Sequence, residues 1–161
     1  MKKTIYISGP ITDNATGQPR EGWQKKFMEA EKKLRQMGYG TINPVDIAEE
    51  TEREWSEQRA AVRFDKRLKT LFSGNPSRST YITACLNTMN EEYLVGRLHG
   101  MYLIGDGYDI VRSHGVQMEM RMAKVLGIPV FYEGFGDKET CIDLQRAANG
   151  LRLCDGGKFE L

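Results

Sequence analysis

Hydrophobic residues along this chain change repeatedly between two spacings, that of a buried strand and that of a helix with one apolar face. The run at 4–8, TIYIS, is β-branched and aromatic without strict alternation, which is typical of a strand covered on both faces. After a polar loop, apolar residues recur at steps of four and three, at Trp23, Phe27, Ala30, Leu34 and Met37. Gly38 ends this predicted helix, and a second strand is predicted over 39–43, closed by Pro44. The order strand, helix, strand predicts a right-handed βαβ unit.

The second half of the chain continues the same alternation. The predicted elements are a helix over 80–98, strands over 101–104 and 128–132, helices over 115–126 and 137–149, and a weaker strand over 151–154. A polar loop is predicted over 105–112, with Ser113 as the N-cap of the helix that follows it. We therefore expect one α/β domain over 1–161, a doubly wound, mostly parallel sheet of four to five strands, flavodoxin-like or Rossmann-like. Such sheets bind ligands at the carboxyl ends of their strands.

A strongly charged segment interrupts this pattern after the second strand. The sequence EETEREWSEQRAAVRFDKRLKTLF carries Trp55, Val62, Leu68 and Phe72 only loosely at helical spacing, and the turn-rich SGNPSRS follows it. We interpret the region from about 48 to 78 as an exposed helical insertion that serves as a lid or a dimer arm.

Composition narrows the classes of protein that remain. With 23 Lys and Arg against 22 Asp and Glu, the net charge of +1 predicts no partnership with a nucleic-acid polymer or an anionic membrane. The three cysteines, Cys85, Cys141 and Cys154, are widely separated and lack a CxxC spacing, which argues against a disulfide framework or a zinc site. The first apolar run is short and ends in Gly-Pro, unlike a signal peptide, so we expect a cytoplasmic protein.

A carboxylate occupies an unexpected position on the helix predicted after Ser113. At about 100° per residue, Gln117, Arg121 and Lys124 form one solvent stripe and Glu119 lies nearly opposite it, among apolar residues. Burying an unpaired carboxylate costs several kcal/mol, so Glu119 faces either a buried ion-pair partner or a pocket. Its place after the third strand, at the rim where such sheets bind ligands, favours the pocket.

On the preceding helix, Glu92 borders the apolar stripe and could reach the same rim, although a carboxylate at a helix edge is most often simply solvated. This residue is a weaker candidate than Glu119.

Three stretches, IYISGPIT, AEKKLRQMGYGTINP and SHGVQMEMRMAKVLGIPV, resemble segments of one family in the same order and spacing. This family is the nucleoside 2-deoxyribosyltransferase superfamily, which includes the 2'-deoxynucleoside 5'-phosphate N-hydrolases and a poorly characterised phage and bacterial branch. The third stretch resembles the family signature, in which Ser or Asp, one residue, Gly and three further residues precede a nucleophilic Glu. The resemblance covers the α/β frame and leaves out the charged insertion.

The resemblance assigns roles to residues of this chain by position. It implies that Glu119 is the nucleophile, that Tyr6 orients it, and that Glu92 stands near the family's second carboxylate, usually Asp. The residues that it implies for substrate binding are Gly9, Pro10, Ile11, Ser113 and Gly115. Gly9, which has no Cβ, would let the backbone approach the sugar closely.

The implied reaction has two steps and retains configuration at the anomeric carbon, through a covalent deoxyribosyl-Glu119 intermediate. Resolution by water makes a hydrolase and resolution by another base makes a transferase, and neither needs a metal or a redox cofactor. Ser113 at a helix N-terminus favours a 5'-monophosphate substrate, whereas Pro10, where the hydrolases more often carry Ser, argues for a free nucleoside. Relatives complete their pockets across a subunit interface, so the partners expected are a small nucleoside or nucleotide and a second copy of the chain.

Two other classes compete with this interpretation. A non-catalytic nucleotide-binding module of the same fold suits the pair His99-Gly100, which stands where relatives commonly have Asp. A flavodoxin-like or response-regulator domain is disfavoured, because the first strand ends in SGP without an acidic cluster or a phosphate loop.

Overall fold

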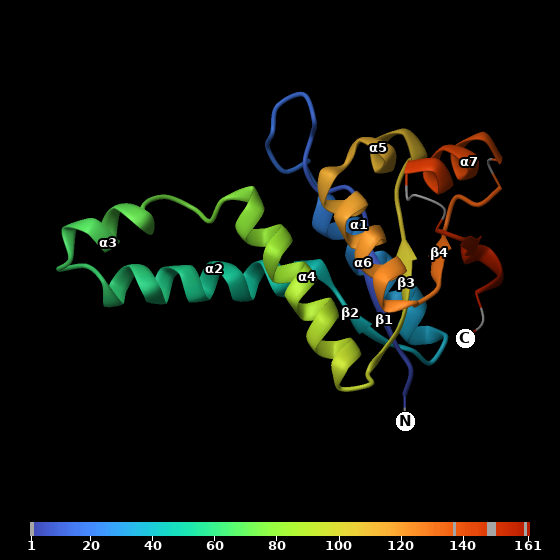
Figure 1. Ribbon diagram of the computed structural model, residues 1–161, viewed down its shortest axis with the longest axis horizontal. Coiled ribbons are helices and arrows are strands. Elements are labelled where there is room, and N and C mark those ends of the chain that lie inside the picture. The colour runs from blue at the N-terminus through green and yellow to red at the C-terminus, as the bar shows by residue number, and fades with distance from the viewer. Residues whose placement is uncertain (1, 137, 148–150, 160) are drawn as a thin grey trace.

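The computed structural model describes residues 2–136, 138–147, 151–159 and 161, and these form a parallel sheet with helices on both faces (Figure 1). The strands, in the sheet order β2-β1-β3-β4-β5, are β2 (Gly40–Ile42), β1 (Thr4–Ser8), β3 (Leu98–Leu103), β4 (Val130–Tyr132) and β5 (Leu153–Asp155). The helices are α1 (Trp23–Gln36), α2 (Pro44–Ala61), α3 (Lys66–Leu71), α4 (Arg78–Leu94), α5 (Gly107–Arg112), α6 (His114–Leu126) and α7 (Lys138–Ala147), followed by a short 3-10 turn at Gly156–Lys158. The predicted doubly wound α/β class is confirmed.

Strand β1 separates two apolar layers. Ile5 and Ile7 belong to the layer that contains Phe27 of α1, whereas Tyr6 belongs to the layer that contains Met89 of α4. Side chains alternate between the two faces of a strand, so the sequence TIYIS supplies both layers at once. Tyr6 and Ser8, two residues apart, therefore point toward the α4 and α6 side.

The boundary between α4 and β3 differs from the sequence prediction. The helix ends at Leu94 rather than near residue 98, because Gly96 adopts a left-handed φ of 72° that closes the helix. The strand then begins at Leu98, three residues earlier than predicted, since Leu98 pairs with Thr4 and Gly100 pairs with Ile5 of β1, and the register shifts between these two pairs.

The predicted loop over 105–112 is wrong in most of its length, because residues 107–112 form α5. The side chain of Asp106 caps this helix by accepting a hydrogen bond from the Tyr108 amide at 2.9 Å. A helix of six residues is too short to show the periodic pattern on which a sequence prediction depends.

Helices α2 and α3 project from the body of the molecule as a thin arm (Figure 1). Helix α2 begins in the body, where the Asn43 side chain accepts a hydrogen bond from the Val45 amide at 3.1 Å. Farther out, Trp55 packs edge-on against Phe72 with ring centroids 4.8 Å apart, and its indole nitrogen donates to the Gly74 carbonyl at 3.2 Å. The charged segment is therefore exposed and helical as predicted, but it consists of two helices that fold back on each other.

None of the three cysteines, all of which lie within the described residues, forms a disulfide; Cys85 and Cys141 are buried and Cys154 is half-buried. Within the described part of the chain, no helix combines the length and the apolar character needed to cross a membrane.

Candidate active site

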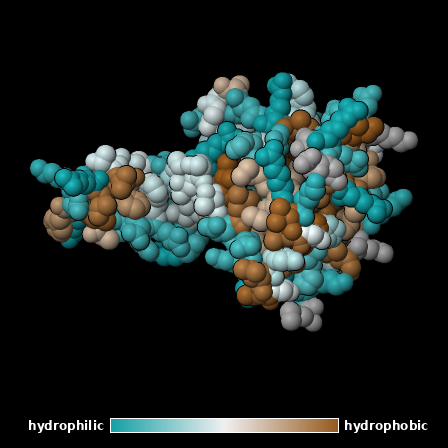
Figure 2. Space-filling model, viewed as in Figure 1, coloured by the Kyte–Doolittle hydropathy of each residue, from teal (hydrophilic) through white to brown (hydrophobic). Residues whose placement is uncertain are grey.

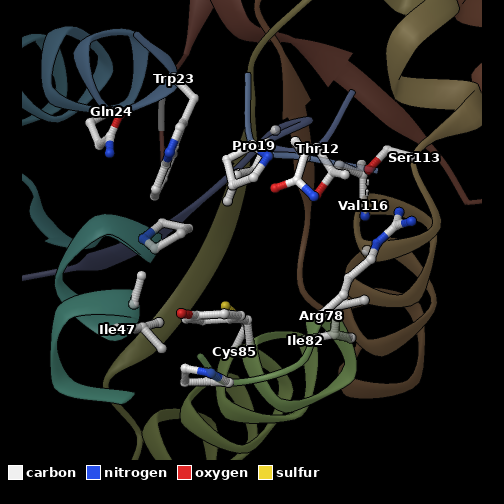
Figure 3. Close-up of a pocket in the computed structure, with 18 of the residues that line it drawn as sticks. Thr12, Pro19, Trp23, Gln24, Ile47, Arg78, Ile82, Cys85, Ser113 and Val116 are labelled. Atoms are coloured by element: carbon white, nitrogen blue, oxygen red, sulfur yellow. Dashed lines mark hydrogen bonds between the residues drawn. The ribbon is translucent and has the colours of Figure 1, made fainter. Parts of the chain in front are cut away.

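A cavity of about 530 Å³ opens at the carboxyl end of β1, between the body and the root of the arm (Figure 3). Its walls come from the loop after β1, the loop before α4, and the amino-terminal halves of α1, α2, α4 and α6. Trp23 and Ile47 lie on one side of it, and Ser113 and Val116 lie on the other. The cavity has the size of a typical small-molecule site, which is about 300 to 1,000 Å³.

Glu119 lines this cavity and is almost entirely withdrawn from solvent, with 8% of its surface exposed. Its Oε1 accepts a hydrogen bond from the Tyr6 hydroxyl at 2.7 Å, and its Oε2 accepts one from the Ser8 hydroxyl at 2.5 Å. The two donors can reach one carboxyl group because they share a face of β1. The prediction that Glu119 points inward is confirmed.

Burial dominates the electrostatics of Glu119. Loss of hydration raises the pKa of this carboxyl group to about 7, although the hydrogen bonds from Ser8 and Tyr6 act in the opposite direction. No basic side chain among the described residues forms an ion pair with it. Of the two alternatives left open by the sequence, a buried ion pair and a pocket, the structure has the pocket.

The groups around Glu119 remain protonated at neutral pH. Burial, followed by the neighbouring Glu119 charge, raises the pKa of Tyr6 well above its usual value. The same two causes raise the pKa of the Cys85 thiol to about 12, so Cys85 is a weak nucleophile despite lining the cavity. Near neutral pH, Glu119 is thus the ionisable group of this cluster, and Tyr6 and Ser8 are its hydrogen-bond donors.

The structure brings most of the predicted residues together. Gly9, Ile11, Ser113 and Gly115 line the same cavity as Glu119. Ser113 also caps α6, since its hydroxyl oxygen accepts a hydrogen bond from the Val116 amide at 3.4 Å.

The packing of the fold also requires that Gly9 lack a side chain. A Cβ at this position would lie 2.7 Å from Cγ1 and 3.1 Å from the carbonyl oxygen of Ile104, and 3.2 Å from Phe27. The direction of the missing Cβ is therefore toward the core, and the close approach is between the first loop and the end of β3.

Pro10, which was predicted to contact substrate, is not among the residues that line the cavity. It packs instead against Gly105, where an added Cβ would meet Pro10 Cδ at 2.9 Å. Pro10 therefore faces the loop after β3, whereas Ile11 lines the cavity.

Glu92 does not lie at the rim of the sheet that it was predicted to reach. It lies near the end of α4 and forms an ion pair with Arg97, with Nε to Oε2 at 2.7 Å. Helix α4 runs back from the carboxyl edge of the sheet to the amino end of β3, so its last turn is at the opposite edge from the cavity. Helical periodicity identifies the face of a residue but not the edge of the sheet that it reaches.

Four residues of the site were not predicted: Ser8, which bonds to Glu119 without lining the cavity, and three residues of the cavity lining. Ser8 holds Glu119, and the alternation of β1 could have identified it from Tyr6. Glu52 of α2 accepts a hydrogen bond from the Tyr81 hydroxyl of α4 at 2.9 Å, and both line the cavity. Arg78 lies at the start of α4, and among the described residues of the lining it is the one basic side chain of the Lys or Arg type. Figure 3 shows that it extends toward Ser113 and Val116. The last three lack a sequence signal because they come from the charged segment and the helix after it.

Comparisons of this chain with models of protein families, with curated proteins and with solved structures find no match. Within the described residues, no group of three or more His, Cys, Asp or Glu side chains is arranged to hold a metal ion.

Replacing Glu119 by Gln should stabilise the protein above neutral pH. Because the folded pKa of about 7 exceeds the ordinary value of 4.5, the folded state binds the extra proton and loses stability as pH rises through this interval. The difference corresponds to roughly 3 kcal/mol once both states are ionised. We expect urea denaturation to show Glu119→Gln more stable than the wild type at about pH 8, with most of that advantage gone at about pH 5. Exposed Glu29→Gln is the control, and a pH-independent difference for Glu119→Gln would contradict the raised pKa.

Proposed function

We propose that this protein cleaves the N-glycosidic bond of 2'-deoxynucleoside 5'-monophosphates or deoxynucleosides, with the Glu119 carboxylate as nucleophile. The observation that carries the proposal is the buried Glu119 side chain, which lines a ligand-sized cavity. Each of its carboxyl oxygens accepts a hydrogen bond from a hydroxyl group, that of Tyr6 or that of Ser8. The resemblance of three sequence stretches to the nucleoside 2-deoxyribosyltransferase superfamily supports it from an independent direction. We accordingly propose membership of that superfamily.

In the first step of the proposed reaction, a carboxylate oxygen of Glu119 attacks C1' of the deoxyribose. The new bond joins C1' to this oxygen, the bond from C1' to the base nitrogen breaks, and the base leaves with the electron pair and takes a proton from solvent. Water then attacks C1', releases the Glu119 carboxylate and gives its proton to solvent. Tyr6 and Ser8 fix the rotamer of Glu119, so the attacking oxygen is positioned before substrate binds.

The two sides of the cavity suit different parts of a nucleotide. Ser113 caps α6, where backbone amides and the helix dipole favour an anion, and the guanidinium of Arg78 is directed to this side (Figure 3). We place the 5'-phosphate there. The base then lies toward Trp23 and Ile47, which offer an aromatic and an aliphatic surface.

Glu92 does not line the cavity, so a different polar group has to contact the base. The hydrogen-bonded pair of Glu52 and Tyr81 lies in the cavity and can do so. Burial and the adjacent Glu52 raise the pKa of Tyr81 to about 12, so its phenol stays protonated and keeps donating to Glu52. The remaining lone pairs of Glu52 can accept N–H groups of a base. We propose that this pair recognises the leaving base.

The nucleophile assignment predicts that Glu119→Ala keeps its fold and loses at least about a hundredfold in release of free base, because no neighbour can share the role. Base release from a panel of deoxynucleosides and deoxynucleotides, measured by chromatography, tests this with Glu29→Ala as control.

Wild-type kcat/KM should rise with pH through about 7, as the Glu119 carboxylate forms. Peptide mass spectrometry after acid quench should find the sugar on Glu119. Near-normal turnover by Glu119→Ala would reject the assignment, and incorporation of an added labelled base would identify a transferase.

The phosphate placement predicts opposite responses of two substrates. Ser113→Asp puts a carboxylate beside the phosphate, and like charges about 4 Å apart at an effective dielectric near 20 repel by about 4 kcal/mol. Even a third of this repulsion is about tenfold in binding, so kcat/KM for the monophosphate should fall while that for the nucleoside is mostly kept. Arg78→Gln should shift the ratio the same way, and Arg121→Gln, on the solvent stripe of α6, should not. An unchanged ratio in both variants would place the phosphate elsewhere.

Base recognition by Glu52 predicts a change in preference rather than a general loss. A hydrogen bond to a charged group contributes about 1.5 to 3 kcal/mol, so Glu52→Gln should change the kcat/KM ratio between bases with and without an exocyclic amino group by about tenfold or more. Glu49→Gln, exposed on the same helix, is the matched control. Equal losses on every base would instead assign Glu52 a structural role.

A further inference from the structure

Charge is segregated along the arm. The stem, which is α2 (Pro44–Ala61), carries six acidic residues against two basic ones. The tip, which comprises residues 62–72 and includes α3, carries four basic residues against one acidic one: Arg63, Lys66, Arg67 and Lys69 against Asp65. The arm therefore carries net negative charge along its stem and net positive charge at its tip.

The tip also exposes large apolar side chains. Phe64, just before α3, is 86% exposed, and Leu68 and Leu71 of α3 are 40% and 66% exposed. Figure 2 shows brown, hydrophobic atoms gathered at the far end of an arm that is otherwise mainly pale or teal. Exposed apolar residues clustered in this way are typical of an interaction surface.

Three of the six acidic residues of the stem, Glu50, Glu54 and Glu57, lie on the face that points away from α3. Trp55 and Arg59 lie on the inner face, where Arg59 Nε donates to the Phe72 carbonyl at 2.8 Å. On the opposite face, Arg53 is shared between Glu50 and Glu57 in ion pairs, and Glu54 adds a further negative charge. This outer face has more carboxylates than its one guanidinium can neutralise.

We propose that two copies of this chain pair through their arms, the basic apolar tip of each copy lying on the acidic outer face of the other copy's stem. Two antiparallel arms related by a twofold axis make the same favourable contact twice, as closed dimers require. A second copy is the partner that fits because both complementary surfaces belong to the same arm. An anionic membrane or a nucleic acid would attract the tip and repel the stem.

This pairing does not depend on the proposed reaction, and the oligomeric state tests it directly. Sedimentation of the full chain should show a dimer at low salt that weakens as salt rises. The tip-reversed variant Lys66→Glu/Arg67→Glu and the stem-reversed variant Glu54→Lys/Glu57→Lys should each raise the dimer dissociation constant at least tenfold. The variant with all four changes should dimerise again, and an equimolar mixture of the two reversed variants should form a heterodimer. Phe64→Ser should weaken the dimer without changing its dependence on salt.

The control is Lys25→Glu/Lys32→Glu, which reverses two exposed charges on α1 and should leave association unchanged. Circular dichroism confirms that each variant keeps its helices, so a loss of pairing is not a loss of fold. A wild-type monomer at micromolar concentration would overturn the proposal. So would a dimer that ignores either reversal, a failure of the four-change variant to recover, or binding of the tip to anionic vesicles or an oligonucleotide by a chain that does not self-associate.

Discussion

The desolvation of one carboxyl group is the constraint on which the site depends. Glu119 sits in a layer of apolar residues between the sheet and α6, and two hydroxyl groups of β1 replace the water that it loses. These hydrogen bonds only partly offset the free-energy cost of burying the charge, so the pKa of Glu119 remains raised, at about 7. The fold therefore keeps an unfavourable group in place through the packing around it, which is common where a side chain serves chemistry rather than stability.

Hydrophobic periodicity encodes the direction in which a side chain points, but not which edge of the sheet it reaches. Helix α6 has a clear apolar face, so the inward direction of Glu119 was predictable from spacing alone, and so was the strand that carries Tyr6. The position of Glu92 was not, because its distance from the cavity depends on which edge of the sheet the last turn of α4 reaches. Ser8 was predictable in principle from strand alternation, whereas α5 was too short to leave a pattern.

The cavity combines an ordinary α/β edge with a segment particular to this chain. The loop after β1 and the start of α6 are where such a sheet is expected to bind a ligand. The opposite wall comes from the root of the arm and the helix that follows it, including Ile47, Glu52 and Arg78. The residues that would choose among substrates thus lie mainly on the arm side, and the group that would react lies on the sheet side.

The two tryptophans of this chain lie in separate parts of the structure. Trp23 borders the cavity in an edge-on contact with Phe27, and Trp55 packs inside the arm against Phe72. Intrinsic fluorescence therefore contains two local signals, one from the ligand site and one from the hairpin of α2 and α3. Single-tryptophan versions of the protein would separate occupancy of the cavity from opening of the arm without any added label.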